Sequence, residues 1–340
     1  MGPISHADAY VALLFQAADG GRGPLLFGDS LDRARALVPP FMLGQEFPSV
    51  YLEHPLLGEP SLDVTVLYGQ LSAGSRAESP AAGEHAAMMD WYSEVRKEHP
   101  NVSAGFELDT SREELPLAAV HFQPFGETQL VRPFCEAVGM PGRADLYLDQ
   151  AARMPYGWDL AFFGMFRGRP DTPLRVCGYL NDDVRLACAS DPSCLAEAFG
   201  AIGFEAYDDK MLAQVAELLD AAPHTVDFQF DVFPDGTLGP TFAVDLQFGV
   251  ERPELVMRSF SEGDAARVMG LLERYGVADD RWRQAVRSAF ARWIPVELDD
   301  GSPARFSLTL MPQWVKARWT DGELQPSKLY HYANAKVLDT

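Results

Sequence analysis

The chain places acidic and amide side chains at alternate positions of one predicted hairpin. Residues 225–233 read TVDFQFDVF, and residues 241–249 read TFAVDLQFG. Asp227 and Asp231 fall on the face opposite Phe228 and Phe230 of the first run, and Asp245 falls on the matching face of the second. Carboxylates gathered in this way can hold Mg²⁺, receive a cationic ligand or accept a proton.

Basic and tyrosine side chains alternate in the same manner, mostly near the end of the chain, where 314–319 reads WVKARW and 327–332 reads SKLYHY. Together with one earlier strand, these runs supply a set of hydrogen-bond donors: Arg175, Tyr179, Lys316, Arg318, Lys328 and Tyr330. Such a set suits a diphosphate, because purely structural ion pairs need fewer partners. The alternative is that inward acids and bases neutralise one another as buried ion pairs in a packed barrel.

The elements that must position these residues are short alternating strands and helices. Strands are predicted at 61–68, 102–109, 117–123, 144–149, 158–166, 173–180, 225–233, 241–249, 305–311, 314–319 and 327–334. Helical spacing predicts helices at 6–18, 30–38, 84–98, 127–138, 193–200, 209–221, 262–275 and 280–292. Strand pairs joined by tight turns must be antiparallel, which excludes a doubly wound parallel sheet.

The predicted fold class is α+β: a closed antiparallel β-barrel of about ten strands, ringed by helices, with a polar lumen. Closure removes exposed strand edges, and the helices cover the apolar face of each strand. If the faces were reversed, the phenylalanines of 225–233 would lie in water. No segment has the composition of an interdomain linker, so we predict one domain spanning 1–340.

Composition narrows the classes of partner. The 340 residues carry a net charge of −21, which opposes binding to nucleic acid. No apolar run reaches 18 residues and the first twenty residues hold no Lys or Arg, so the sequence predicts neither a membrane span nor export, but a cytoplasmic location. We expect a monomer.

Three segments resemble the ABBA-fold prenyltransferases, whose barrel is built from repeated helix-strand-strand-helix units. These are Ser61-Leu62-Asp63-Val64, the stretch SAGFELDTSREELPLAAVH at 103–121, and the ending FSLTLMP…WVKARW…SKLYHY. The likeness spans most of the chain in pattern and leans toward the cyanobactin-type peptide prenyltransferases. It is weak in exact motifs, because 118–121 reads AAVH where the family often carries basic contacts to the diphosphate.

The resemblance implies that an allylic diphosphate, dimethylallyl or geranyl, ionises to a carbocation that a nucleophile captures. Asp63 would be the acceptor base, and the six donors named above would bind the diphosphate. The residues that would shield the carbocation or hold the acceptor are Glu107, Tyr147, Trp158, Phe163, Asp227, Asp231 and Tyr332, and Asp245 is the candidate ligand for Mg²⁺. The excess of acid fits a cationic acceptor such as an arginine or lysine side chain, and the likeness to the cyanobactin type favours a peptide over a small cationic or aromatic acceptor.

Two other classes of function remain open at this stage. The lumenal aspartates could serve a metal-dependent hydrolase or lyase whose basic group orients a substrate carboxylate. The thin basic zone also allows a barrel that binds peptides without catalysis.

Overall fold

The computed structural model describes residues 23–38, 41, 49–68, 86–110, 118–166, 173–222, 225–249, 253–297 and 301–338. The helix predicted at 6–18 lies outside these ranges. In the described part of the chain, no helix is long and apolar enough to cross a membrane.

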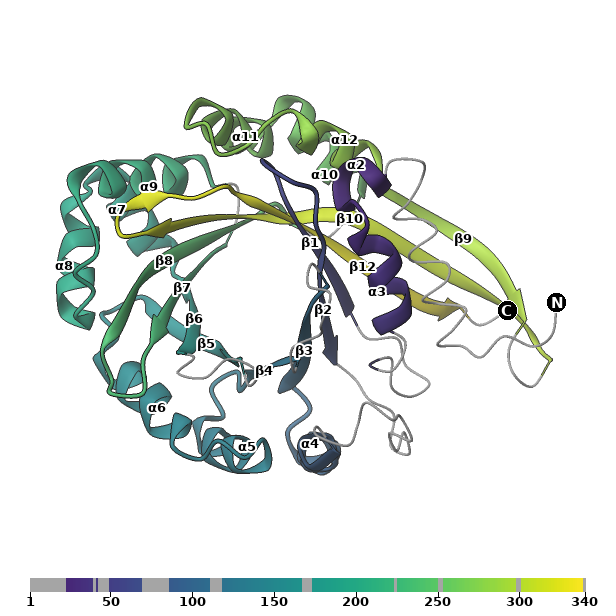
Figure 1. Cartoon of the computed structure of the whole chain (residues 1–340), viewed down its shortest axis with the longest axis horizontal. Coiled ribbons are helices and arrows are strands. Elements are labelled where there is room, and N and C mark those ends of the chain that lie inside the picture. Colours follow the sequence, from purple (N-terminus) through teal and green to yellow (C-terminus); the bar gives the residue numbers. More distant parts are fainter. Residues whose placement is uncertain are drawn as a thin grey trace.

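Ten antiparallel strands close into a barrel, which confirms the predicted fold class (Figure 1). In order around the ring, they are β1 (Ser49–Pro55), β2 (Asp63–Tyr68), β3 (Ser103–Asp109), β4 (Ala119–Gln123), β5 (Trp158–Met165), β6 (Leu174–Leu180), β7 (Val226–Val232), β8 (Leu238–Gln247), β10 (Pro303–Thr320) and β12 (Lys328–Leu338). Two seams complete the ring, where β8 pairs with β10 and β12 pairs with β1. Two further strands, β9 (Phe290–Glu297) and β11 (Glu323–Leu324), pair with β10 outside the ring.

Helices surround the outside of the barrel (Figure 1). They are α2 (Gly23–Phe27), α3 (Ser30–Leu37), α4 (Ala86–Glu98), the 3₁₀ turn η3 (Thr128–Leu130), α5 (Val131–Ala137), α6 (Arg143–Arg153), α7 (Asp182–Ser190), α8 (Ser193–Ile202), α9 (Asp209–Ala221), α10 (Pro253–Glu262), α11 (Asp264–Arg274) and α12 (Arg281–Arg287). Local chemistry fixes several helix starts. The Asp208 carboxylate, for example, accepts a hydrogen bond from the Met211 backbone N–H at 2.8 Å and so caps α9.

The apolar core lies between the strands and the helices. Phe228, Phe230 and Phe242 are at most 1% exposed, and Phe199 of α8 packs edge-to-face on Phe242 with ring centroids 4.8 Å apart. Because successive residues of a strand point to opposite faces, the intervening polar residues of β7 and β8 point into the barrel. The predicted polar lumen follows directly from this packing.

Four sequence predictions need correction. Residues 144–149 belong to helix α6, whose buried face repeats every three residues at Ala144, Tyr147 and Gln150. The strands predicted at 305–311 and 314–319 form the single strand β10, with a register shift between Pro312 and Trp314. The helix predicted at 280–292 ends at Arg287, and β9 follows it. Strand β1 and helices α7 and α10 were not predicted.

Candidate active site

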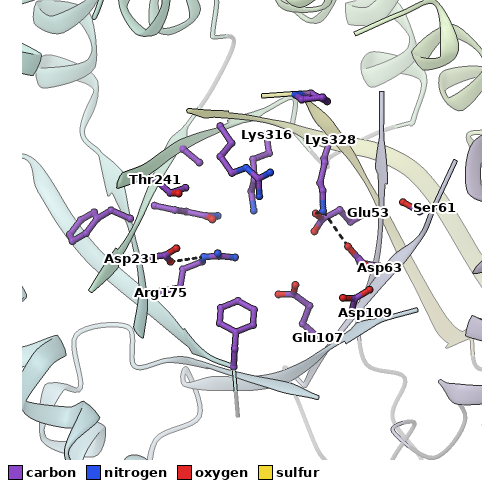
Figure 2. Close-up of a pocket in the computed structure, with 16 residues that line it drawn as sticks. Glu53, Ser61, Asp63, Glu107, Asp109, Arg175, Asp231, Thr241, Lys316 and Lys328 are labelled. Atoms are coloured by element: carbon purple, nitrogen blue, oxygen red, sulfur yellow. Dashed lines mark hydrogen bonds and ion pairs between the residues drawn. The ribbon is translucent and has the colours of Figure 1, made fainter. Parts of the chain in front are cut away.

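The lumen holds two adjoining cavities, and the first is lined mainly by charged side chains. We call it the cationic cavity. It has a volume of about 280 Å³, and its lining residues are Glu53, Ser61, Asp63, Glu107, Asp109, Phe166, Arg175, Gln229, Phe230, Asp231, Thr241, Ala243, Lys316, Arg318, Pro326 and Lys328. Figure 2 shows charged side chains pointing into it from strands on different sides, among them Lys316, Lys328, Glu53, Arg175 and Glu107. The four basic residues predicted to bind a diphosphate are thus brought together here.

The second cavity, of about 300 Å³, is lined by rings and amides, and we call it the aromatic cavity. Its lining residues are Tyr51, Glu53, Thr65, Leu67, Glu107, His121, Gln123, Phe162, Tyr179, Asp227, Gln229, Asp245, Gln247, Gln313, Trp314, Lys316 and Tyr330. Glu53, Glu107, Gln229 and Lys316 line both cavities. A ligand with a charged end and an apolar end could therefore span the two.

Lys328 lies between two carboxylates in the cationic cavity. Its Nζ is 2.5 Å from Glu53 Oε1 and 3.2 Å from Asp63 Oδ2 (Figure 2). Burial alone would lower the pKa of Lys328, but the charge of Glu53 and then that of Asp63 raise it, so the ammonium stays charged. Burial also raises the pKa of Asp63 to about 7, with a further contribution from the charge of Glu53. Asp63 therefore changes charge near neutral pH.

Two of the other cations are also paired with acids. Arg175 Nε lies 3.1 Å from Asp231 Oδ1, and Lys316 Nζ lies 3.8 Å from Asp245 Oδ1. The fourth, Arg318, is exposed and makes no ion pair among the described residues. These pairs hold the basic side chains in place before a ligand arrives, and an anionic ligand must compete with carboxylates for them.

A pair of buried aspartates lies side by side in the aromatic cavity. Asp227 and Asp245 face each other across β7 and β8 and are 8% and 4% exposed. Gln247 donates to Asp227 at 3.0 and 3.1 Å, and Gln229 donates to Asp245 Oδ2, whereas Asp245 Oδ1 has no hydrogen bond. Burial, followed by the charge of Asp245, raises the pKa of Asp227 well above its usual range. Asp245 Oδ1 therefore lacks a hydrogen-bond donor, and a cationic ligand could supply one.

The candidate Mg²⁺ ligands do not form a metal site. Asp245 is engaged by Gln229 and lies near Lys316, and within the described ranges no group of three or more acidic, histidine or cysteine side chains is placed to share one ion. The described side chains alone therefore do not complete a site for Mg²⁺.

Three packed rings form one wall of the aromatic cavity, in which Trp314 stacks on Tyr330 and is tilted by 46° against Tyr51. The Trp314 ring centroid lies 4.6 Å from that of Tyr51 and 4.9 Å from that of Tyr330. Tyr332 packs on Tyr51 with centroids 5.5 Å apart but does not itself line either cavity. Such a wall presents π faces that can stabilise a nearby positive charge.

Several predicted site residues lie elsewhere than expected. Tyr147, Trp158 and Phe163 pack between the barrel and its helices: Phe163 contacts Phe134 of α5 and Tyr147 of α6, and Trp158 contacts Phe199 of α8. They cannot shield a cation in the lumen. Tyr179 and Tyr330 line the aromatic cavity rather than the cationic one, and Asp231 is the partner of Arg175.

The sequence prediction missed Glu53, Tyr51 and Trp314. The first two belong to β1, whose sequence SVYLEHP places Glu53 and His54 next to each other. Both are buried, Glu53 toward the lumen and His54 against Phe27 of α2, so the apolar face of the strand is limited to Val50 and Leu52. The alternation of Tyr51 and Glu53 was the available signal.

Comparison with known proteins agrees with this geometry at the level of the fold. No family model and no curated protein sequence matches the chain. Among solved structures, it is similar to the prenyltransferase PriB in complex with product diphosphate (TM-score 0.55, 12% identity, covering 97% of this chain and 96% of that one). It is also similar to 6-dimethylallyltryptophan synthase from Micromonospora olivasterospora in complex with DMASPP and Trp (TM-score 0.52, 14% identity, 96% and 97% covered) and to AnaPT from Neosartorya fischeri (TM-score 0.52, 10% identity, 96% and 91% covered).

The fold is thus the ABBA barrel of the prenyltransferases. Each of these structures is matched along nearly its whole length, so the barrel and its helices correspond as one unit. The particular closeness to cyanobactin-type enzymes that the sequence pattern indicated is not confirmed.

Proposed function

We propose that this protein is a prenyltransferase that moves a dimethylallyl or geranyl group from an allylic diphosphate to a side chain of a peptide. The observation that carries the proposal is the junction of the two cavities: four cations line one, packed rings line the other, and Lys316 lines both. Two of the similar structures are complexes, one with product diphosphate and the other with DMASPP and Trp, and they support the choice of donor.

The charge of each reacting group indicates which side chains would bind it. Arg175, Lys316 and Lys328 would stabilise the departing diphosphate, whose negative charge grows as the allylic C–O bond breaks. The Tyr51, Trp314 and Tyr330 rings would lie beside the carbocation and keep water from it.

The acceptor part of the proposal rests on Asp227 and Asp245. The free Asp245 Oδ1 can accept a hydrogen bond from a donor, and a cation placed at the pair would favour ionisation of Asp227, whose pKa burial and the charge of Asp245 raise. An arginine or lysine side chain of a peptide satisfies both requirements. An aromatic side chain is the second candidate, since the ring wall offers it a stacking surface. We further propose that the protein acts in the cytoplasm as a monomer.

The proposal is tested by incubating the full chain with dimethylallyl or geranyl diphosphate and peptides that contain Arg, Lys, Trp or Tyr. Mass spectrometry should detect the gain of one prenyl group, and Lys316→Met should abolish it. Lys210→Met is the matched control, because Lys210 forms an exposed pair with Glu323 at 3.0 Å outside the lumen.

Donor binding gives an independent measurement. A ligand at a hundred times its dissociation constant adds about 2.7 kcal/mol to the free energy of unfolding. If neither diphosphate stabilises the protein and no peptide is prenylated, the proposal is wrong. Peptide binding without donor binding would then favour a non-catalytic barrel, and peptide or ester cleavage that requires added metal would favour a hydrolase.

A further inference from the structure

A histidine–carboxylate pair lies in the lumen at the boundary of the two cavities. His121 Nε2 of β4 is 2.9 Å from Glu107 Oε2 of β3, and the side chains are 14% and 22% exposed. His121 lines the aromatic cavity, and Glu107 lines both. Nothing in the function proposed so far uses this pair.

The neighbouring strand shapes a seat for the imidazole ring. Gly164 of β5 is the register partner of His121, and a Cβ atom added at Gly164 would lie 2.9 Å from His121 Cε1 and 3.0 Å from Nδ1. Such a distance is too short for real contacts, so the ring occupies the place that a side chain at 164 would fill. Glu107 and Gly164 together fix the orientation of the ring.

This orientation selects one tautomer of His121. Burial alone would raise the pKa of Glu107, but its hydrogen bond to His121 and the nearby charges of Arg175 and Lys316 hold that pKa well below its usual range. An ionised carboxylate only accepts hydrogen bonds, so Nε2 must donate. In the described part of the chain His121 makes no other hydrogen bond, which leaves the Nδ1 lone pair free to accept a proton.

We propose that His121 is the base that removes the proton from the acceptor during prenyl transfer, and that Glu107 and Gly164 are its positioning residues. This inference rests on the proposed function. The allylic C1–O bond breaks and its electron pair leaves with the diphosphate oxygen. The acceptor's electron pair forms the new bond to C1, and the proton displaced from the acceptor nitrogen or ring carbon passes to His121 Nδ1. Glu107 stabilises the imidazolium until the proton returns to water.

The geometry favours His121 over Asp63 for this role. Asp63 lines only the cationic cavity, where it holds Lys328, whereas His121 lines the cavity with the aromatic wall. A base must lie within hydrogen-bond reach of the proton that it removes. Asp63 therefore acts on the donor side, and His121 faces the acceptor.

The test compares the fate of the donor in His121→Ala with that in the wild-type protein. Removing a general base costs about 10²- to 10⁴-fold in rate. We expect transfer to fall by that factor while hydrolysis of the donor to the prenyl alcohol continues and donor affinity stays within about threefold. Added imidazole should restore part of the transfer. His99→Ala is the matched control, since His99 pairs with Glu127 at 3.4 Å on the outside of the barrel.

Gly164→Ala tests the seat while keeping the base, and it remains informative if His121→Ala does not fold. We expect transfer at least about tenfold below wild type, with alcohol formation retained. Gly270→Ala on α11 is its control, because an added Cβ there meets no atom within 4 Å. Glu107→Gln should fall between wild type and His121→Ala.

Two results would overturn the inference. If His121→Ala transfers within about threefold of wild type, or loses transfer and alcohol formation equally, His121 is not the base. If the wild-type protein yields neither prenylated peptide nor alcohol from either donor, the proposed function itself fails, and the inference fails with it.

Discussion

Replacing Asp63 by Asn should remove most of the pH dependence of donor binding. Lys328 Nζ lies 3.2 Å from Asp63 Oδ2, so an ionised Asp63 competes with a diphosphate for this cation. The raised pKa of Asp63, about 7, means that the carboxyl group is mainly neutral at pH 6 and mainly ionised at pH 8.

The expected magnitude follows from this pKa. If the donor binds the form with neutral Asp63, the apparent dissociation constant scales with one plus the ratio of ionised to neutral carboxyl. Between pH 6 and pH 8 that factor rises about tenfold, so the wild-type affinity should fall about tenfold. Asp63→Asn should lose this dependence and bind the donor at pH 8 as tightly as wild type does at pH 6.

The assay is calorimetric titration with the inert analogue dimethylallyl thiolodiphosphate at pH 6, 7 and 8. Ionisation of the ligand contributes equally to every variant and cancels in the comparison. Asp145→Asn is the matched control, because Asp145 pairs with Arg132 at 2.7 Å on the outer surface. An equal slope in the wild-type protein and in Asp63→Asn would refute the reasoning.

Three further predictions concern stability and metal dependence. Arg175→Met leaves the partly buried Asp231 without its partner, so the free energy of unfolding in urea should fall by about 2–3 kcal/mol. The double variant Arg175→Met/Asp231→Asn should regain most of this loss. Equal losses in the single and the double variant would mean that the two side chains are not coupled. Burial lowers the pKa of His331 to about 4, below its value of 6.5 in the unfolded chain, so the stability that it contributes is present above pH 6.5 and is lost as the pH falls toward 4. Between pH 7 and pH 4.5, the free energy of unfolding should fall by about 2–3 kcal/mol less in His331→Gln than in the wild-type protein. An identical fall in the two proteins would contradict this prediction. EDTA should change donor affinity by less than about threefold, because the basic side chains of the cationic cavity neutralise the charge of the diphosphate. A tenfold loss of affinity would show that a metal ion is needed.

The hairpin of β7 and β8 shows what local sequence determines well. Alternating residues around Asp235-Gly236 predicted both strands, their faces and the inward position of Asp227 and Asp245. The pattern succeeds here because phenylalanines mark one face and carboxylates the other.

Tyr147 shows where alternation misleads. The run ADLYLD has a period of two, yet it forms α6, because Tyr147 packs on Phe163 and the buried positions recur every three residues. Tertiary contacts decide between the strand period of two and the helical period, and the local sequence does not predict these contacts. For the same reason Phe163 could not be assigned to the outer face from its own strand alone.

The ion pairs of the site were beyond sequence reasoning. Arg175 and Asp231 meet because β6 and β7 are adjacent, but Lys328, Glu53 and Asp63 meet only because β12 closes against β1, whose other edge pairs with β2. The sequence assigned Lys328 to a ligand and could not show that two carboxylates already hold it.

The seam between β1 and β12 also sets the order of events as the protein is made. Ser49 and Tyr332, which hydrogen bond across it, are 283 residues apart in the chain. Contacts of such long range form slowly, since the entropy of closing the loop is lost before they yield any stabilisation. On the ribosome the ring cannot shut until the last strand has emerged, and until then the edges of β1 and β8 are open to pairing with other chains. We expect this barrel to depend on chaperones during synthesis more than a helical bundle of the same length would.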